Sequence, residues 1–183
     1  MLNDIRSLIK SNGMYNNKSK KSTKPQEISY KRVQSYMMWM IERYGDYSAK
    51  SLLQKANLLF KEDTQFNQTA LDYLIEHEII DDARYAKRLT MSLAESKIGP
   101  NKIKEKLYAK GFQSATINDC INELETTEDD YFDKALALKI RKFGEEPISD
   151  IKLKQKALRH LTATKGFSYS IANKAITYTP DEE

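Results

Sequence analysis

The feature that most constrains this chain is a helical pattern interrupted by glycine at recurring positions. Apolar side chains recur every three to four residues from about residue 29 onward, as on one face of a helix. Gly99 and Gly111 bound one such segment, and Gly144 and Gly166 bound a longer one. Recurrence at this scale is typical of tandem helical repeats. The pattern predicts an all-α chain in which a three-helix unit occurs three times.

The repeats are expected at 29–79, 80–126 and 127–179. Before them, residues 1–28 are polar and basic, and they are expected to form a flexible tail. Residues 1–32 carry eight Lys or Arg and two acidic side chains, so this tail accounts for part of the basic net charge. Six glycines and four prolines in 183 residues fit long helices with short connections better than a sheet-rich fold.

Helix ends in the first repeat are marked by residues with known end preferences. Gly45 is expected to end the first helix, and Ser48 to cap the second. Asn57 is expected to end that second helix, because asparagine tolerates the left-handed conformation. A third helix is predicted at about 65–78.

Paired aspartates open the later repeats. Asp81 and Asp82 are expected to cap a helix over 82–96, and Asp129 and Asp130 begin the third repeat. Gly99 is expected to end the helix over 82–96, and Pro100 suits the first turn of the next helix. In the third repeat the middle helix is predicted to be longer than its counterparts.

The composition argues against a secreted or membrane-spanning chain. Cys120 is the single cysteine, so an internal disulfide is impossible, which fits a reducing cytoplasm. The first residues lack the long apolar core of a secretory signal, and no apolar run reaches the roughly 18 residues that a membrane span needs. We therefore expect a cytoplasmic protein without a membrane partner.

Residues that could carry enzymatic chemistry are few. The two histidines, His77 and His160, stand in no metal-ligand spacing, and nucleotide-binding or nucleophile motifs are missing from the sequence. The paired aspartates could hold a metal ion, but helix capping explains them fully. We expect no enzyme, no metal site and no cofactor.

Basic side chains form the most informative constellation. In the helix over 82–96, Tyr85, Ala86 and Leu89 share one face and the cations lie opposite. Such surfaces favour a partner rich in phosphate or carboxylate. The candidate partner-binding residues are Arg84, Lys87, Arg88, Lys97, Lys102, Lys104, Lys106, Lys110, Lys139, Arg141 and Lys142. The third repeat adds Lys152, Lys154, Lys156 and Arg159.

Three motifs resemble those of the RecX regulatory proteins. The first is Asp81-Asp82-Ala83-Arg84-Tyr85-Ala86, similar to the family's DD-x-RFA. It is followed by Gly99-Pro100-x-Lys102-Ile103 and by Leu107-x-x-Lys110-Gly111-Phe112. In the first repeat, Tyr47-Ser48-x-x-Ser51-Leu52-x-x-Lys55 is similar to the family's HS-x-x-EL-x-x-KL. The resemblance spans about residues 33–178.

This resemblance implies a modulator of the RecA recombinase. Proteins of this family are elongated, curved stacks of three-helix repeats that bind in the groove of the RecA–DNA filament and inhibit ATP hydrolysis and strand exchange. The expected partners are thus the RecA filament and, weakly or through the filament, DNA, with the protein acting as a monomer. Two alternatives stay open: a helical nucleic-acid-binding protein that acts independently of RecA, and a helical adaptor for an unrelated protein.

Overall fold

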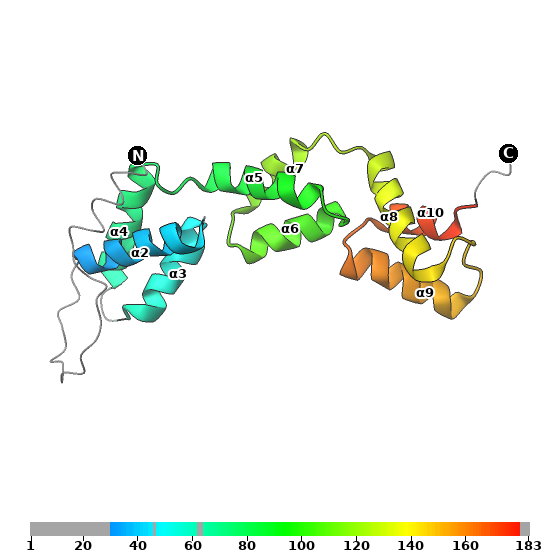
Figure 1. Ribbon diagram of the computed structural model, residues 1–183, viewed down its shortest axis with the longest axis horizontal. Coiled ribbons are helices and arrows are strands. Elements are labelled where there is room, and N and C mark those ends of the chain that lie inside the picture. The colour runs from blue at the N-terminus through cyan, green and yellow to red at the C-terminus, as the bar shows by residue number, and fades with distance from the viewer. Residues whose placement is uncertain (1–29, 46, 62–63, 180–183) are drawn as a thin grey trace. The chain divides into compact units, whose positions relative to one another are not determined.

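The computed structural model describes residues 30–45, 47–61 and 64–179, and every regular element in this part of the chain is a helix. The chain divides into two compact units, and the boundary along the sequence lies between Asp82 and Ala83 (Figure 1). The expected all-α architecture is thereby confirmed for the described residues. The N-terminal tail expected at 1–28 lies outside them.

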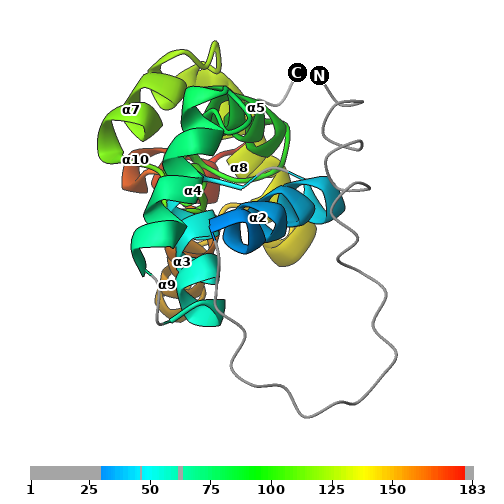
Figure 2. The ribbon, with the colours of Figure 1, turned by 90° about the vertical axis from the view of Figure 1, so that its left-hand side faces the viewer.

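The first unit contains helices α2 (Tyr30–Tyr44), α3 (Ala49–Leu59) and α4 (Thr64–Glu76). Figure 2 shows α2 crossing α4, with α3 beside them. Their apolar faces close over one core, which includes the fully buried Val33, Met37, Leu52 and Leu74. Burying such faces removes apolar surface from water, which is the main force that holds three short helices together.

Of the two predictions about the ends of α3, one is confirmed and one is wrong. Ser48 caps α3 as predicted, its hydroxyl accepting a hydrogen bond from the backbone N–H of Ser51 at 3.2 Å. Asn57 does not end the helix, which continues to Leu59. Instead the Asn57 side-chain oxygen accepts a hydrogen bond from the buried amide of Asn67 at 2.8 Å. This side-chain bond gives Asn57 a role within the helix that its preference for helix ends does not reveal.

The second unit holds the other two repeats, apart from Asp82, the first residue of α5, which ends the first unit. The second repeat comprises α5 (Asp82–Ala94), α6 (Pro100–Ala109) and α7 (Ser114–Asn122) around a core that includes Ile103, Leu107 and Ile117. The third repeat comprises α8 (Glu128–Phe143), α9 (Ile151–Arg159), the π-helical turn η1 (His160–Thr164) and α10 (Tyr169–Thr177). Since η1 continues α9 directly, the middle helix of this repeat is longer than α6, as predicted.

The third repeat begins one residue before the paired aspartates. Thr127 caps α8 in a reciprocal arrangement, in which its hydroxyl accepts from the Asp130 N–H and the Asp130 carboxylate accepts from the Thr127 N–H. The Thr127 hydroxyl also donates to that carboxylate at 2.7 Å. These bonds hold the pKa of Asp130 below its usual value. Asp130 thus serves the helix end, as the sequence pattern indicated.

Two backbone hydrogen bonds, together called the backbone joint below, connect the second and third repeats. The N–H groups of Gly99 and Asn101, at the start of α6, donate to the carbonyls of Lys165 and Gly166 at 2.7 and 3.1 Å. The negative end of the α9–η1 helix thus meets the positive end of α6, which is a favourable alignment of helix dipoles. The sequence pattern predicted that Gly99 ends α5, and this prediction is wrong. Helix α5 ends at Ala94, and Gly99 is the N-cap of α6. Glycine is required there because an added Cβ would overlap the carbonyl of Gly166.

Candidate functional site

Helix α5 presents three cations on the side away from its core face. Ala86 is fully buried and the ring of Tyr85 packs edge-on against Phe112, with centroids 5.2 Å apart. Arg84, Lys87 and Arg88 are exposed. The two-sided character that the sequence predicted for this helix is therefore present in the structure.

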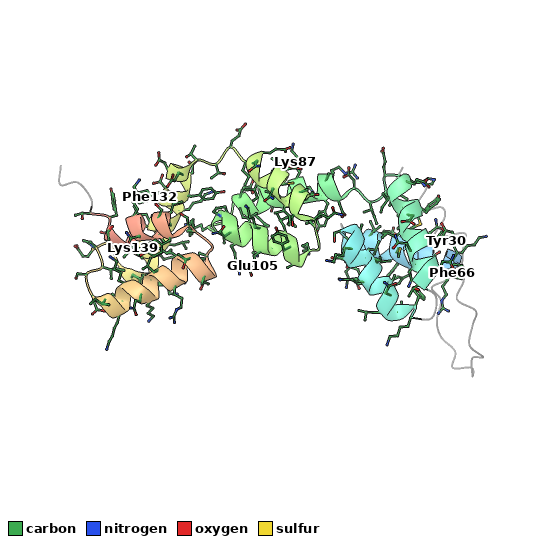
Figure 3. All side chains as sticks on the ribbon, turned by 180° about the vertical axis from the view of Figure 1, so that it is seen from behind. Tyr30, Phe66, Lys87, Glu105, Phe132 and Lys139 are labelled. Carbon is green, nitrogen blue, oxygen red and sulfur yellow. The ribbon has the colours of Figure 1, made fainter. Side chains whose placement is uncertain are left out.

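The Lys87 ammonium forms an ion pair with Glu123 at 2.8 Å, and this bond raises the pKa of Lys87. Both side chains are more than half exposed, so the pair contributes little to stability and can be exchanged for a partner's carboxylate or phosphate. Lys87 lies on the surface of the second repeat in Figure 3.

Helix α6 extends the basic surface. Ile103 and Leu107 point into the core, while Lys106 and Lys110 are exposed and Lys104 is half-buried. Lys97 is exposed in the connection between α5 and α6. The ammonium of Lys102 contacts both carboxylate oxygens of Glu105 at 2.6 and 2.7 Å, so its charge is partly neutralised within the helix.

One predicted site residue lies in the interior. Lys139 is fully buried, and its ammonium donates to the backbone carbonyls of Glu145 and Glu146 at 2.5 and 2.7 Å (Figure 3). Burial lowers its pKa, because a charged amine is disfavoured away from water. Lys139 therefore holds the loop after α8 and is not available to a partner. Its place on the buried face with Ala135 and Leu138 could have been found from helical spacing.

The other two candidates in α8 are at the surface. Arg141 and Lys142 are exposed in its last turn, where cations favour the negative helix end. The Lys142 ammonium lies 3.1 Å from Nδ1 of His160. This neighbour was not expected from the sequence, because the π-helical turn that positions His160 has no recognisable sequence signature.

Helix α9 carries a further set of cations outside the second repeat. Lys152, Lys156 and Arg159 are exposed and Lys154 is half-buried, while Ala157 faces the core. Ile151 is also exposed, at 73%. The third repeat therefore offers a surface that is both basic and partly apolar.

Other kinds of site find no support in the described residues. No three histidine, cysteine, aspartate or glutamate side chains gather there in a way that could hold a metal ion. Among the described helices, none combines the length and apolar character that a membrane span requires. The candidate site is thus a charged surface on α5, α6 and the end of α8.

Models of a known protein family match two of the three repeats. Residues 81–121 match the second three-helix domain of RecX, and residues 128–176 match its third three-helix domain. The matched residues cover the helices that carry the candidate cations.

Curated relatives and a solved structure agree with these matches. The chain is 31% identical over 156 residues to a regulatory protein RecX of Acinetobacter baylyi, covering 85% of this chain and 93% of that protein. It is 30% identical to a regulatory protein RecX of Clostridioides difficile, over 73% of this chain and 61% of that relative. A crystal structure of RecX from Lactobacillus salivarius has a similar fold, with a TM-score of 0.64 and 22% identity, over 80% of this chain and 94% of that one.

Proposed function

This chain belongs to the RecX family of regulatory proteins, and on that basis we propose that it binds the RecA–DNA filament and inhibits it. It binds as a monomer in the filament groove and slows ATP hydrolysis and strand exchange. Its cellular effect, in the cytoplasm, is then to restrain recombinational DNA repair and the SOS response. It does this by binding alone, without chemistry of its own.

Family membership is the observation that carries this proposal, and the charged surface supports it. The exposed cations of α5 stand on a helix whose other face is fixed in a core, so their spacing is held by the fold. A polymer of identical subunits on DNA presents acidic groups and phosphates at regular intervals. Fixed cations on successive repeats suit such a surface better than a small ligand.

The proposal is tested by following ATP hydrolysis by RecA on single-stranded DNA while this protein is added at near-physiological salt. We expect suppression when there are far fewer copies of the protein than RecA subunits, because a few bound copies disable a long filament. Continued hydrolysis at equimolar protein would reject the proposal. Binding to DNA alone under those conditions would favour the alternative of a nucleic-acid-binding protein that acts independently of RecA. The affinity of such a protein for DNA falls steeply with salt.

The α5 surface is tested by reversing three charges together, in the variant Arg84→Glu, Lys87→Glu, Arg88→Glu. We expect inhibition to weaken about tenfold or more, with helicity unchanged, since each exposed charge contact is worth about 1 kcal/mol. The control reverses the exposed Lys31, Lys50 and Lys61 of the first unit, which gives the same net charge. Equal loss in both variants would show that net charge alone matters and that α5 is not the contact surface.

A further inference from the structure

His160, at the start of the π-helical turn, contacts Lys142 of α8 and is acted on by the charges of Lys165 and Arg141. The Lys142 ammonium lies 3.1 Å from His160 Nδ1, so the lysine donates and the ring nitrogen accepts. The imidazole ring meets the edge of Phe143, with centroids 6.0 Å apart. Phe143 thereby helps to fix the ring that Lys142 contacts.

The π-helical turn is followed by a second lysine, Lys165, whose charge acts on His160. The backbone N–H of Lys165 donates to the carbonyl of His160 at 3.1 Å, a bond that spans five residues and is characteristic of a π-turn. The carbonyl of Lys165 in turn accepts from the N–H of Gly99 in the backbone joint. The position of Lys165 is therefore held by backbone bonds on both sides. π-Turns are frequent at functional sites.

The charged groups around the histidine are mainly positive. Burial lowers the pKa of His160, and repulsion from Lys142, Lys165 and Arg141 lowers it further. Lys156 and Arg159 precede His160 in α9. On neighbouring elements, Lys102 contacts Glu105, Lys174 lies over the ring of Phe132, and the charges of Glu145 and Glu146 act on Lys139.

We propose that Lys142, His160 and Lys165 form a binding site for a single phosphate group, with Arg141 at its edge. The Lys142 ammonium is in contact with the imidazole and the charge of Lys165 acts on the same ring, so an anion beside them replaces mutual repulsion by attraction. A phosphate group has more acceptor oxygens and a higher negative charge than a carboxylate, so it offsets the charges of several cations better. The phosphate is either part of a nucleic-acid backbone or a free phosphate ester. The site goes beyond the proposed action on RecA, since it concerns a ligand of the isolated protein.

The two histidines make the site directly observable by NMR. Binding of a phosphate raises the pKa of His160, because the anion stabilises the protonated ring. His77 is an internal control in the first unit, where its Nδ1 lies 2.9 Å from the Tyr73 carbonyl oxygen. The imidazole resonances of the full chain are followed against pH at constant ionic strength, with inorganic phosphate, oligothymidylate or acetate added.

We expect phosphate or oligothymidylate to raise the His160 pKa in a saturable way, with no change at His77 and none with acetate. A response to oligothymidylate at far lower concentration than to inorganic phosphate supports a nucleic-acid backbone as the source. A response to inorganic phosphate alone supports a free phosphate ester. An unchanged His160, or an equal shift at His77 or with acetate, overturns the proposal.

The variant Lys142→Gln, Lys165→Gln should need about fivefold more ligand or higher for the same saturation, as expected for the loss of partly exposed charge contacts. The control variant, Lys31→Gln, Lys50→Gln, carries the same change in net charge at exposed positions of the first unit and should bind as the wild type does. Equal affinity of the two variants would also overturn the proposal. Because no RecA is present, the result does not depend on the proposed inhibition.

Discussion

The side chain of Asp82 links the paired-aspartate motif to the preceding repeat. Its carboxylate accepts a hydrogen bond from the backbone N–H of Ala49, the first residue of α3, at 2.8 Å. The sequence pattern suggested only that Asp82 caps the helix it begins. In the structure it satisfies a donor at the start of a helix 33 positions earlier. The Asp82 carboxylate therefore links the last residue of the first unit to the start of α3, the middle helix of that unit.

The environment of Asp82 leads to a prediction at this scale. Burial raises the pKa of Asp82, only partly opposed by the bond from Ala49, and the Asp81 charge raises it further. The stability that this group contributes is therefore full below its ordinary pKa and falls as the pH rises through the raised pKa. At pH 7, Asp82→Asn keeps an acceptor without the charge. Asp82→Ala leaves the Ala49 N–H unpaired and should be about 1–2 kcal/mol less stable than Asp82→Asn.

Urea denaturation of the two Asp82 variants measures this difference, with Trp39 fluorescence as the probe because the first unit contains the chain's single tryptophan. The wild type should gain stability relative to Asp82→Asn as the pH falls through the raised pKa. Equal stability of Asp82→Asn and Asp82→Ala would show that the bond to Ala49 contributes nothing.

At the scale of elements, the backbone joint holds the end of the α9–η1 helix against the start of α6, so that the middle helices of the second and third repeats lie end to end. Gly166 has a positive φ of 78°, and an added Cβ would overlap the backbone nitrogen of Lys102. Two separate demands, a left-handed conformation and close approach of two backbones, therefore fall on one residue. Both demands must be met for the hydrogen bonds of the joint to form.

Gly166→Ala should therefore be far more destabilising than a glycine substitution that meets only one demand. Gly144 is the matched control, because its φ is 92° and no atom lies within 4 Å of an added Cβ. We expect a loss of about 1–2 kcal/mol for Gly144→Ala, from conformation alone, and at least about 2 kcal/mol more for Gly166→Ala. Thermal unfolding followed by circular dichroism measures the stability of both variants. Similar losses of stability would show that the backbone joint accommodates the added methyl group at little cost.

Local features of the sequence predicted most of the helices, and features that depend on distant contacts were missed. Ser48 acts within one turn of its own helix, and apolar spacing identified Ile103 and Leu107 as core. In contrast, the close approach of Gly99 to Gly166 joins residues far apart in the chain. Lysine is rarely buried, so its residue type favours the surface for Lys139, whereas helical spacing places it on the inward face of α8. The contact of Lys142 with His160 depends on a π-turn, which local propensity does not predict.

At the scale of the whole molecule, the described residues form separate apolar cores. One core lies in the first unit, around Met37 and Leu74, and the second unit contains its own around Ile103 and around Leu161. Each core excludes water by itself, so each unit has its own source of folding free energy. The second unit also has the backbone joint between its repeats. Stability is then expected to differ between the two units.

This difference predicts two unfolding transitions that one protein sample can report separately. Trp39 fluorescence follows the first unit, and the imidazole resonance of His160 follows the second. Leu74→Ala removes a fully buried side chain from the first unit and should lower the free energy of unfolding of that unit by about 2–4 kcal/mol. The urea midpoint of the Trp39 transition should fall accordingly. The His160 transition should keep its midpoint. Leu161→Ala, in the core of the third repeat, is the reciprocal control and should move only the His160 transition. If either substitution shifted both transitions equally, the two units would unfold as one cooperative body.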